Sequence, residues 1–168
     1  MTQLTADKIM KALQLIPLEP EGGYFKEVYR SDEKIEKSAL PKRFPGSRTL
    51  STSIYYMLKK GMKSTAHRLK ADEIWHFYLG GPLTLVEIEP DGKVRKTIMG
   101  HDLENGQVLQ YVFRRGTVFG AYLSDKAEYA LIGATVAPGF EYEDFEMPSK
   151  EDLLKEFPNA AEAIELLT

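Results

Sequence analysis

The sequence of 168 residues contains no cysteine and only three histidines. Without cysteine the chain cannot form disulfides, thiol nucleophiles, iron–sulfur clusters or thiolate zinc sites, and this composition fits a reducing compartment. The first 13 residues interrupt their apolar positions with Asp7, Lys8 and Lys11, so we expect no signal peptide. These absences predict a cytoplasmic protein.

Long hydrophobic runs and basic clusters are also missing. The most apolar stretch, Ala130–Ala137, is far shorter than the roughly 20 residues of a membrane-spanning helix. The 22 Lys and Arg residues are outnumbered by 25 Asp and Glu, and no basic block suggests a nucleic-acid footprint. A chain of this length with 43% hydrophobic residues can bury a core as one domain. We therefore expect a single domain, residues 1–168, that binds neither membranes nor nucleic acid.

Helical patterns occur only near the two ends of the chain. Apolar residues recur at helical spacing between residues 5 and 16, and Pro17 ends this pattern. Ser149 and Asp152 form a capping-box signal that precedes another helical region. The chain is thus predicted to contain an N-terminal helix and lead-in (1–20), a β-barrel (21–146) and C-terminal helices (147–168).

The middle of the chain alternates short runs rich in Val, Ile, Tyr, Phe and Thr with Gly, Pro, Asp and Asn, which is typical of strands and turns. The clearest turn, Asp91-Gly92, should join two strands as a hairpin. Regularly spaced strands without intervening helices favour a mainly β fold, and we favour a jelly roll. The nine predicted strands span residues 24–30, 49–58, 64–69, 73–79, 83–89, 93–99, 107–113, 118–123 and 129–136.

Two segments between these strands are assigned structural roles. Residues 31–48, rich in Lys, Ser and Pro, form the longest expected loop. The acidic residues 141–146 lack the spacing and the central glycine of a calcium loop. Their alternation favours an edge strand or an extended arm that packs Tyr142 and Phe145.

The densest group of chemically useful side chains lies in residues 61–80, which include two of the three histidines. His67 and Glu73 lie on consecutive strands joined by a tight turn, and pairing of these strands would bring imidazole and carboxylate together in the barrel interior. Trp75 shares the face of Glu73, whereas His76 points to the opposite face. The pair either performs acid–base chemistry, with Glu73 orienting His67, or is a buried histidine hydrogen-bonded to a carboxylate.

Gly61, His67, Glu73 and Gly80 fall at the spacing of the first cupin motif, with Leu69 in place of its second histidine. The second cupin motif resembles residues 114–119, which keep its glycine but carry Arg and Phe in place of its proline and histidine. The sequence therefore resembles the cupin superfamily. Three further segments resemble one branch of small cupins of uncharacterised function: residues 20–30, 72–78 and 136–145.

The resemblance implies a double-stranded β-helix, a jelly-roll barrel with short terminal helices, that commonly forms homodimers. Many cupins hold a divalent ion with three histidines and a glutamate, and this chain keeps only two of those four ligands. Two ligands bind a metal weakly. We therefore expect no required cofactor, although a weakly bound divalent metal remains possible if a bulge lets His76 join His67 and Glu73.

Two function classes follow from this sequence. The first is a binding module that holds a small molecule in its barrel, with a sugar- or nucleotide-like ligand as the candidate. The side chains expected to line its pocket are Tyr24, Glu27, Tyr55, Trp75, Phe77 and Arg114, beside the central pair.

The second class is an isomerase that transfers a proton. Gly23, Phe25 and Glu27 resemble the early signature of cupin-fold epimerases that act on deoxysugar nucleotides, and His67 falls at the position of their catalytic base. This resemblance implies a metal-free or weakly metal-assisted epimerase that acts on a carbonyl-containing sugar nucleotide. The chain departs from it where the tyrosine pair that supplies the proton donor is replaced by Val136-Ala137.

Overall fold

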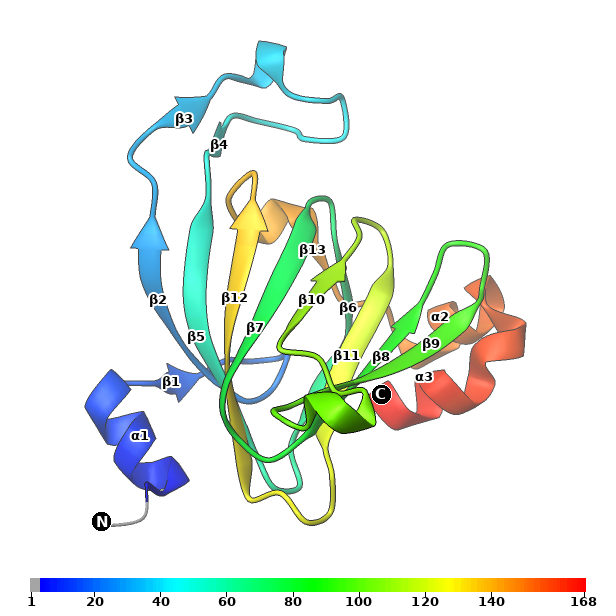
Figure 1. Cartoon of the computed structure of the whole chain (residues 1–168). Helices are drawn as coiled ribbons and strands as arrows, with labels where there is room; N and C mark the ends of the chain where they lie inside the picture. Colours follow the sequence, from blue (N-terminus) through cyan, green and yellow to red (C-terminus); the bar gives the residue numbers. More distant parts are fainter. Residues whose placement is uncertain (1–3) are drawn as a thin grey trace.

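Two antiparallel sheets face each other in the computed structural model, which describes residues 4–168 (Figure 1). The six-stranded sheet has the order β1 (Ile16–Pro17), β2 (Tyr24–Arg30), β5 (Thr52–Lys59), β12 (Tyr129–Ala137), β7 (Asp72–Gly80) and β10 (Gln110–Phe113). The five-stranded sheet has the order β13 (Phe145–Glu146), β6 (Lys63–Leu69), β11 (Val118–Leu123), β8 (Leu83–Ile88) and β9 (Val94–Met99). A small ribbon pairs β3 (Lys34–Ile35) with β4 (Arg48–Thr49).

Helices cover the outer faces of these sheets. The helix α1 (Ala6–Leu13) is capped by the Thr5 hydroxyl and packs Ile9 against the outer face of β5 and β12. Helices α2 (Lys150–Glu156) and α3 (Ala161–Leu167) cover the other sheet, and Ser149 caps the first of them as predicted. Short 3-10 turns complete the structure: η1 (Lys37–Ala39), η2 (Leu103–Asn105), η3 (Tyr142–Asp144) and η4 (Pro158–Ala160). No helix within residues 4–168 is long and apolar enough to cross a membrane.

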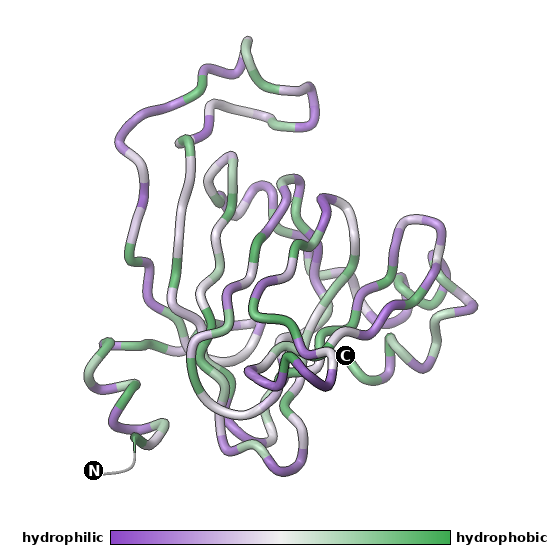
Figure 2. Tube along the Cα trace, in the orientation of Figure 1, coloured by the Kyte–Doolittle hydropathy of each residue, from purple (hydrophilic) through white to green (hydrophobic). Residues whose placement is uncertain are grey.

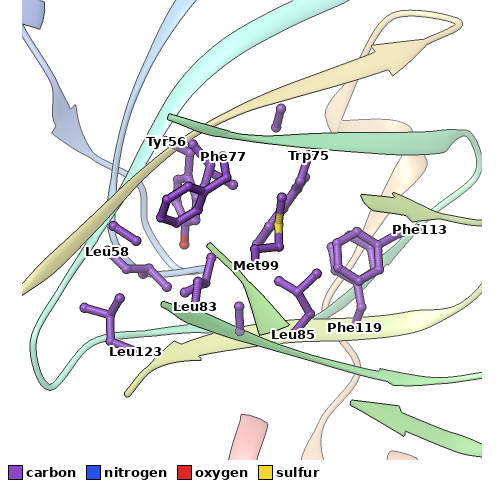
Figure 3. Packing of buried hydrophobic residues seen from close by; sticks show 14 of the residues in the cluster. Tyr56, Leu58, Trp75, Phe77, Leu83, Leu85, Met99, Phe113, Phe119 and Leu123 are labelled. Carbon is purple, nitrogen blue, oxygen red and sulfur yellow. The ribbon is translucent and has the colours of Figure 1, made fainter. Parts of the chain in front are cut away.

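The main hydrophobic core lies between the sheets (Figure 3). The rings of Phe113 and Phe119 stack with centroids 3.9 Å apart, and Trp75 meets both rings edge-on. Leu85 and Met99 close the core from β8 and β9. Burial of side chains of this size contributes roughly 1.5–3 kcal/mol each, so this core anchors the inner faces of both sheets.

The mainly β jelly roll predicted from the sequence is confirmed. All nine predicted strands are present, each with ends shifted by at most three residues, and hydrophilic and hydrophobic residues intermix along them (Figure 2). The hairpin at Asp91-Gly92 joins β8 to β9, and Gly92 has the positive φ of 84° that this turn requires. The two-residue strands β1 and β3, which are too short to show a pattern, were not predicted. The predicted strand 49–58 is divided into β4 and β5, and β13 lies at the sheet edge within residues 141–146, where an edge strand or an arm was expected.

A buried ion pair ties the long loop between β2 and β5 to the segment that follows β12. The Arg48 guanidinium donates to both carboxylate oxygens of Asp144, with Nε–Oδ2 and Nη2–Oδ1 distances of 2.6 and 2.8 Å. Both residues are buried, at 3% and 5% exposed. The segment after β12, residues 140–146, which we call the arm, therefore lies against the barrel, where Phe145 pairs with Leu69 of β6.

Candidate functional site

A cavity of about 340 Å³ lies between the two sheets, bordered by β2, β5, β6, β7, β12, the 18–21 loop and the arm. Most of its wall is apolar, formed by Leu18, Pro20, Phe25, Ile54, Tyr56, Leu69, Trp75, Ala134, Val136, Phe140, Tyr142 and Phe145. The polar lining consists of Glu19, Glu21, Glu27, Arg30, Thr52, His67, Glu73 and Glu141.

His67 and Glu73 enter this cavity from opposite sheets. Pairing of β6 with β7 was predicted, but β6 belongs to the five-stranded sheet and β7 to the six-stranded sheet. The chain crosses from one sheet to the other at residues 70–71, and both side chains line the same cavity. His67 and Glu73 come together because the two sheets face each other in the barrel, and not because β6 and β7 pair.

The imidazole of His67 is held in one orientation by its own strand. Its Nδ1 lies 2.7 Å from the carbonyl oxygen of Thr65. Because a carbonyl oxygen only accepts, Nδ1 carries a proton, and in the neutral ring the lone pair is then on Nε2. The ring packs against Phe119 and Phe145, with centroids 4.2 and 5.3 Å away. The Thr65 carbonyl therefore orients the His67 ring, a role that had been predicted for Glu73.

Glu73 is a buried carboxylate that is only half satisfied. Its Oε1 accepts a hydrogen bond of 2.9 Å from Trp75 Nε1, while its Oε2 has no hydrogen-bond partner among the described residues. Burial raises the pKa of this carboxyl group to about 7; His67 opposes the shift and Glu21 adds to it. A buried polar atom without a partner costs about 1–3 kcal/mol, so Oε2 is a position where a ligand donor would be stabilised.

The cavity wall carries several more carboxylates near its entrance. The Arg30 guanidinium lies 2.9 Å from a carboxylate oxygen of Glu27 and 2.9 Å from one of Glu141, and it also donates to the Phe140 carbonyl at 3.2 Å. Its pKa is raised, chiefly by the hydrogen bond to Glu27. Glu21 accepts a hydrogen bond of 2.8 Å from the Ser64 hydroxyl. The lining thus contains five carboxylates and a single guanidinium, already paired twice.

Of the six side chains predicted to line the pocket, two do so: Glu27 and Trp75. Tyr24 and Tyr55 lie on the other face of their strands, where they pack beside α1. Their neighbours Phe25 and Tyr56 face the cavity instead, because successive side chains of a strand point to opposite faces.

The other two predicted residues lie elsewhere. Phe77 is on the inner face of β7 but is buried in the main core beyond the cavity. Arg114 is exposed at the end of β10, where it forms an ion pair of 2.9 Å with Asp72. Its charge is therefore neutralised at the sheet edge, outside the cavity lining.

Sequence reasoning missed the residues that the arm contributes. Phe140, Glu141, Tyr142 and Phe145 all line the cavity, although residues 141–146 had been assigned a purely structural role. No local signal identifies them, since the arm is held at the cavity by residues far away in the sequence: β6, Arg48, and Arg30, which pairs with Glu141. Tyr56 could have been predicted as a lining residue once Ile54 was placed inside, because residues two apart on a strand point to the same face.

The side chains present do not fit the four-ligand metal centre considered from the sequence. Its second and fourth positions hold Leu69 and Phe119, and Phe119 packs against the His67 ring. His76 interacts through Nε2 with the Thr135 hydroxyl (3.2 Å) and through Nδ1 with Gln110 (2.9 Å), on the face away from the cavity. The β7 bulge lies beyond His76 and leaves that face unchanged.

Consistent with this arrangement, nowhere in residues 4–168 do three or more His, Cys, Asp or Glu side chains gather as a metal-binding group.

Comparison with known proteins gives a consistent result. The model of a family described as Cupin superfamily (DUF985) matches residues 7–148. An uncharacterised protein of Saccharomyces cerevisiae, YML079W, is 33% identical over 154 residues, which cover 87% of this chain and 77% of that protein.

Solved structures show the same architecture. A hypothetical protein from Leishmania major has a TM-score of 0.89 at 32% identity, covering 98% of this chain and 99% of that one. Protein SO0799 from Shewanella oneidensis has a TM-score of 0.87 at 34% identity, covering 99% and 98%. An oxalate decarboxylase from Bacillus subtilis has a TM-score of 0.55 at 17% identity, covering 92% of this chain and 37% of that one, and this likeness concerns the fold alone.

Proposed function

Since this chain belongs to the cupin superfamily, in a family of uncharacterised function, we propose that it binds a small organic molecule in the cavity between its sheets. The observation that carries this proposal is at Glu73, a residue of the cavity wall whose buried Oε2 atom has no hydrogen-bond partner among the described residues. Water or a ligand donor must satisfy such an atom if its cost is to be offset.

The make-up of the cavity supports binding of an organic ligand. Small-molecule sites have volumes of roughly 300–1,000 Å³ and mostly apolar walls with a few polar groups that fix orientation. The volume of about 340 Å³ lies at the lower end of that range. The polar groups His67 and Glu73 stand in a wall that otherwise consists largely of aromatic and aliphatic side chains. A compact ligand with a hydrogen-bond donor fits this description.

A fragment screen by ligand-observed NMR tests the proposal. Ala134→Leu extends a side chain into the cavity and should abolish binding of the hits, whereas Ala39→Leu, on the exposed turn η1, should leave binding unchanged. Circular dichroism establishes that both variants are folded, because an overpacked position can cost about 1–3 kcal/mol. Hits that bind both variants equally would place the ligand outside the cavity and overturn the proposal.

A second candidate is a proton-transfer enzyme of the isomerase or epimerase class. The observation that favours it is the hydrogen bond from His67 Nδ1 to the Thr65 carbonyl, because in the neutral ring this bond leaves Nε2 as the base. Glu73, with a pKa of about 7, lines the same cavity and can exchange a proton near neutral pH. Base and acid would then stand on opposing sheets.

Solvent-deuterium incorporation into a bound ligand separates this enzyme from a binding module. If the second candidate holds, His67→Gln should reduce exchange about a hundredfold or more, the usual share of general acid–base catalysis. His76→Gln, on the opposite face of β7, should leave exchange unchanged. Full exchange in the His67 variant would reject His67 as the base.

Assembly and location stay predictions. We propose a homodimer, as the family resemblance implies, and sedimentation at micromolar concentration that shows only a 19.0 kDa species would refute it. The cytoplasmic location rests on the absence of cysteine.

A further inference from the structure

We infer that the cavity selects a small organic cation, a primary ammonium group on a compact apolar body, over neutral or anionic molecules of the same shape. This inference rests on the proposed function, because it names the chemical class of ligand that the same cavity takes. Three properties of the lining support it: its balance of charge, the kind of hydrogen-bonding atoms left without partners, and its aromatic rings.

The charge balance of the lining disfavours anions. Five carboxylates face one guanidinium, that of Arg30. Glu27 and Glu141 each form an ion pair with Arg30, so its positive charge is already neutralised within the wall. Proteins recognise phosphate and carboxylate ligands with Arg or Lys that can form charge-assisted hydrogen bonds. A sugar nucleotide would find no free cation here, and its diphosphate would meet the carboxylates of the entrance.

The unpartnered polar atoms of the central pair are both acceptors. Glu73 Oε2 has no donor, and in the neutral ring of His67 Nε2 is an acceptor, because Nδ1 donates to Thr65. An ammonium group has three donors and no acceptor, so two of its N–H groups can satisfy these two atoms, and it brings no lone pair that needs a donor of its own. A carboxylate brings only acceptors, and a hydroxyl brings one donor with two lone pairs that also need partners.

Aromatic side chains complete the match. Tyr56, Trp75 and Phe145 belong to the cavity wall, and aromatic faces attract cations while they bury an apolar body. Trp75 also donates to Glu73, so its ring and the carboxylate that would bind the ammonium group are held in one arrangement. The wall therefore combines a negative charge with a surface that a hydrated metal ion would not use.

Three probes of one shape test this inference: 2-phenylethylamine, 2-phenylethanol and 3-phenylpropionate. They are titrated into the protein by calorimetry at about pH 8, where an alkyl ammonium group stays protonated. We expect the amine to bind about tenfold or more tightly than the alcohol, since hydrogen bonds to charged groups are the stronger ones. The propionate should bind more weakly than either.

Glu73→Gln tests whether the preference comes from this carboxylate. The variant keeps an acceptor for Trp75, removes the charge and places an amide N–H donor where Oε2 was. The amine should therefore lose about tenfold in affinity, while the alcohol, whose hydroxyl can also accept, changes by less than about threefold. Glu128→Gln, an exposed residue outside the cavity, removes the same charge from the protein and should change neither affinity.

The outcomes separate the charge preference from binding itself. If the alcohol or the propionate binds as tightly as the amine, or if the preference survives in Glu73→Gln, the cation inference is overturned and cavity binding stands. If none of the three probes binds the unaltered protein, the cation inference is likewise overturned. The proposed binding function is then decided by the fragment screen and its Ala134→Leu variant.

Discussion

Two buried glutamates on the inner faces of the sheets are equally exposed, at 7% each, but differ in their hydrogen-bond and charge partners. Glu87 of β8 accepts a hydrogen bond of 2.6 Å from the Tyr111 hydroxyl and lies 3.1 Å from Arg95 Nε. Glu73 of β7 has only the Trp75 indole, and its second oxygen faces no donor among the described residues. The partners of Glu87 connect β8 to β9 and β10, whereas the single partner of Glu73 leaves an acceptor available.

This difference separates a carboxylate that stabilises the fold from one that is a candidate for function. A buried charge with matched partners stabilises the arrangement that surrounds it, while a buried charge without them costs stability. Groups arranged against stability are concentrated at functional sites, where perturbed pKa values also cluster. The free energies of unfolding of variants at these positions test the contrast between Glu87 and Glu73.

The largest effect is expected at a third buried carboxylate, Asp144, which has both oxygens bonded to Arg48. Asp144→Asn leaves the 3% exposed guanidinium without its buried countercharge. Loss of one partner of a buried pair costs about 3–5 kcal/mol. Urea denaturation should show a decrease of that size, together with exposure of the arm to limited proteolysis. A decrease below about 1 kcal/mol would mean that this pair does not hold the arm.

The second effect has the opposite sign. Glu73 has a pKa of about 7 in the folded protein against 4.5 for the ordinary group, because burial disfavours its charge, with Glu21 and His67 as the charged or titratable neighbours. Between these two values the folded state binds more protons than the unfolded state, so stability falls as pH rises from about 4.5 to about 7.

Glu73→Gln removes this penalty and should increase the free energy of unfolding by up to about 3 kcal/mol at about pH 8, and by almost nothing at about pH 4.5. Urea denaturation of both proteins at these pH values provides the measurement. A variant that is less stable than the parent at about pH 8 would contradict the view that Glu73 is held against stability.

The matched substitution Glu87→Gln should destabilise by about 1–2 kcal/mol, because Tyr111 and Arg95 lose a charged partner. The pKa of Tyr111, raised to about 12 by burial and by its bond to Glu87, should move toward its ordinary value. Ultraviolet titration of the tyrosines measures this shift. If Glu73→Gln and Glu87→Gln change stability in the same direction, the comparison between the two sites fails.

The smallest effect is expected from metal removal. With Leu69 and Phe119 supplying carbon where ligands would be needed, purified protein should contain well under one equivalent of any transition metal by elemental mass spectrometry. Chelation should change Tm by less than about 1 °C, since no binding free energy is lost. A stoichiometric metal that disappears in His67→Ala would show that the cavity holds one after all.

Local pattern was enough for most of the fold. The strands, the hairpin at Gly92 and the Ser149 cap were predicted because each depends on residues within a few positions of one another. The spacing of the first cupin motif also singled out His67 and Glu73, which are six residues apart on strands joined by a short turn. It did not show that their strands lie in different sheets.

Three features of the site were decided only by tertiary structure. Which face of β2 and β5 points inward depends on the sheet opposite, so Phe25 and Tyr56 line the cavity where Tyr24 and Tyr55 had been predicted. The arm completes the wall through the Arg48–Asp144 pair, whose partners are 96 residues apart.

The third feature is the charge of the cavity, which comes from carboxylates that lie far apart in the sequence, such as Glu21 and Glu141. By itself the sequence determined the strands, the terminal helices and the presence of an imidazole near a carboxylate, because backbone geometry and periodicity are local. The closed barrel determined which atoms of that pair remain free, because hydrogen-bond satisfaction depends on everything that packs around a buried group.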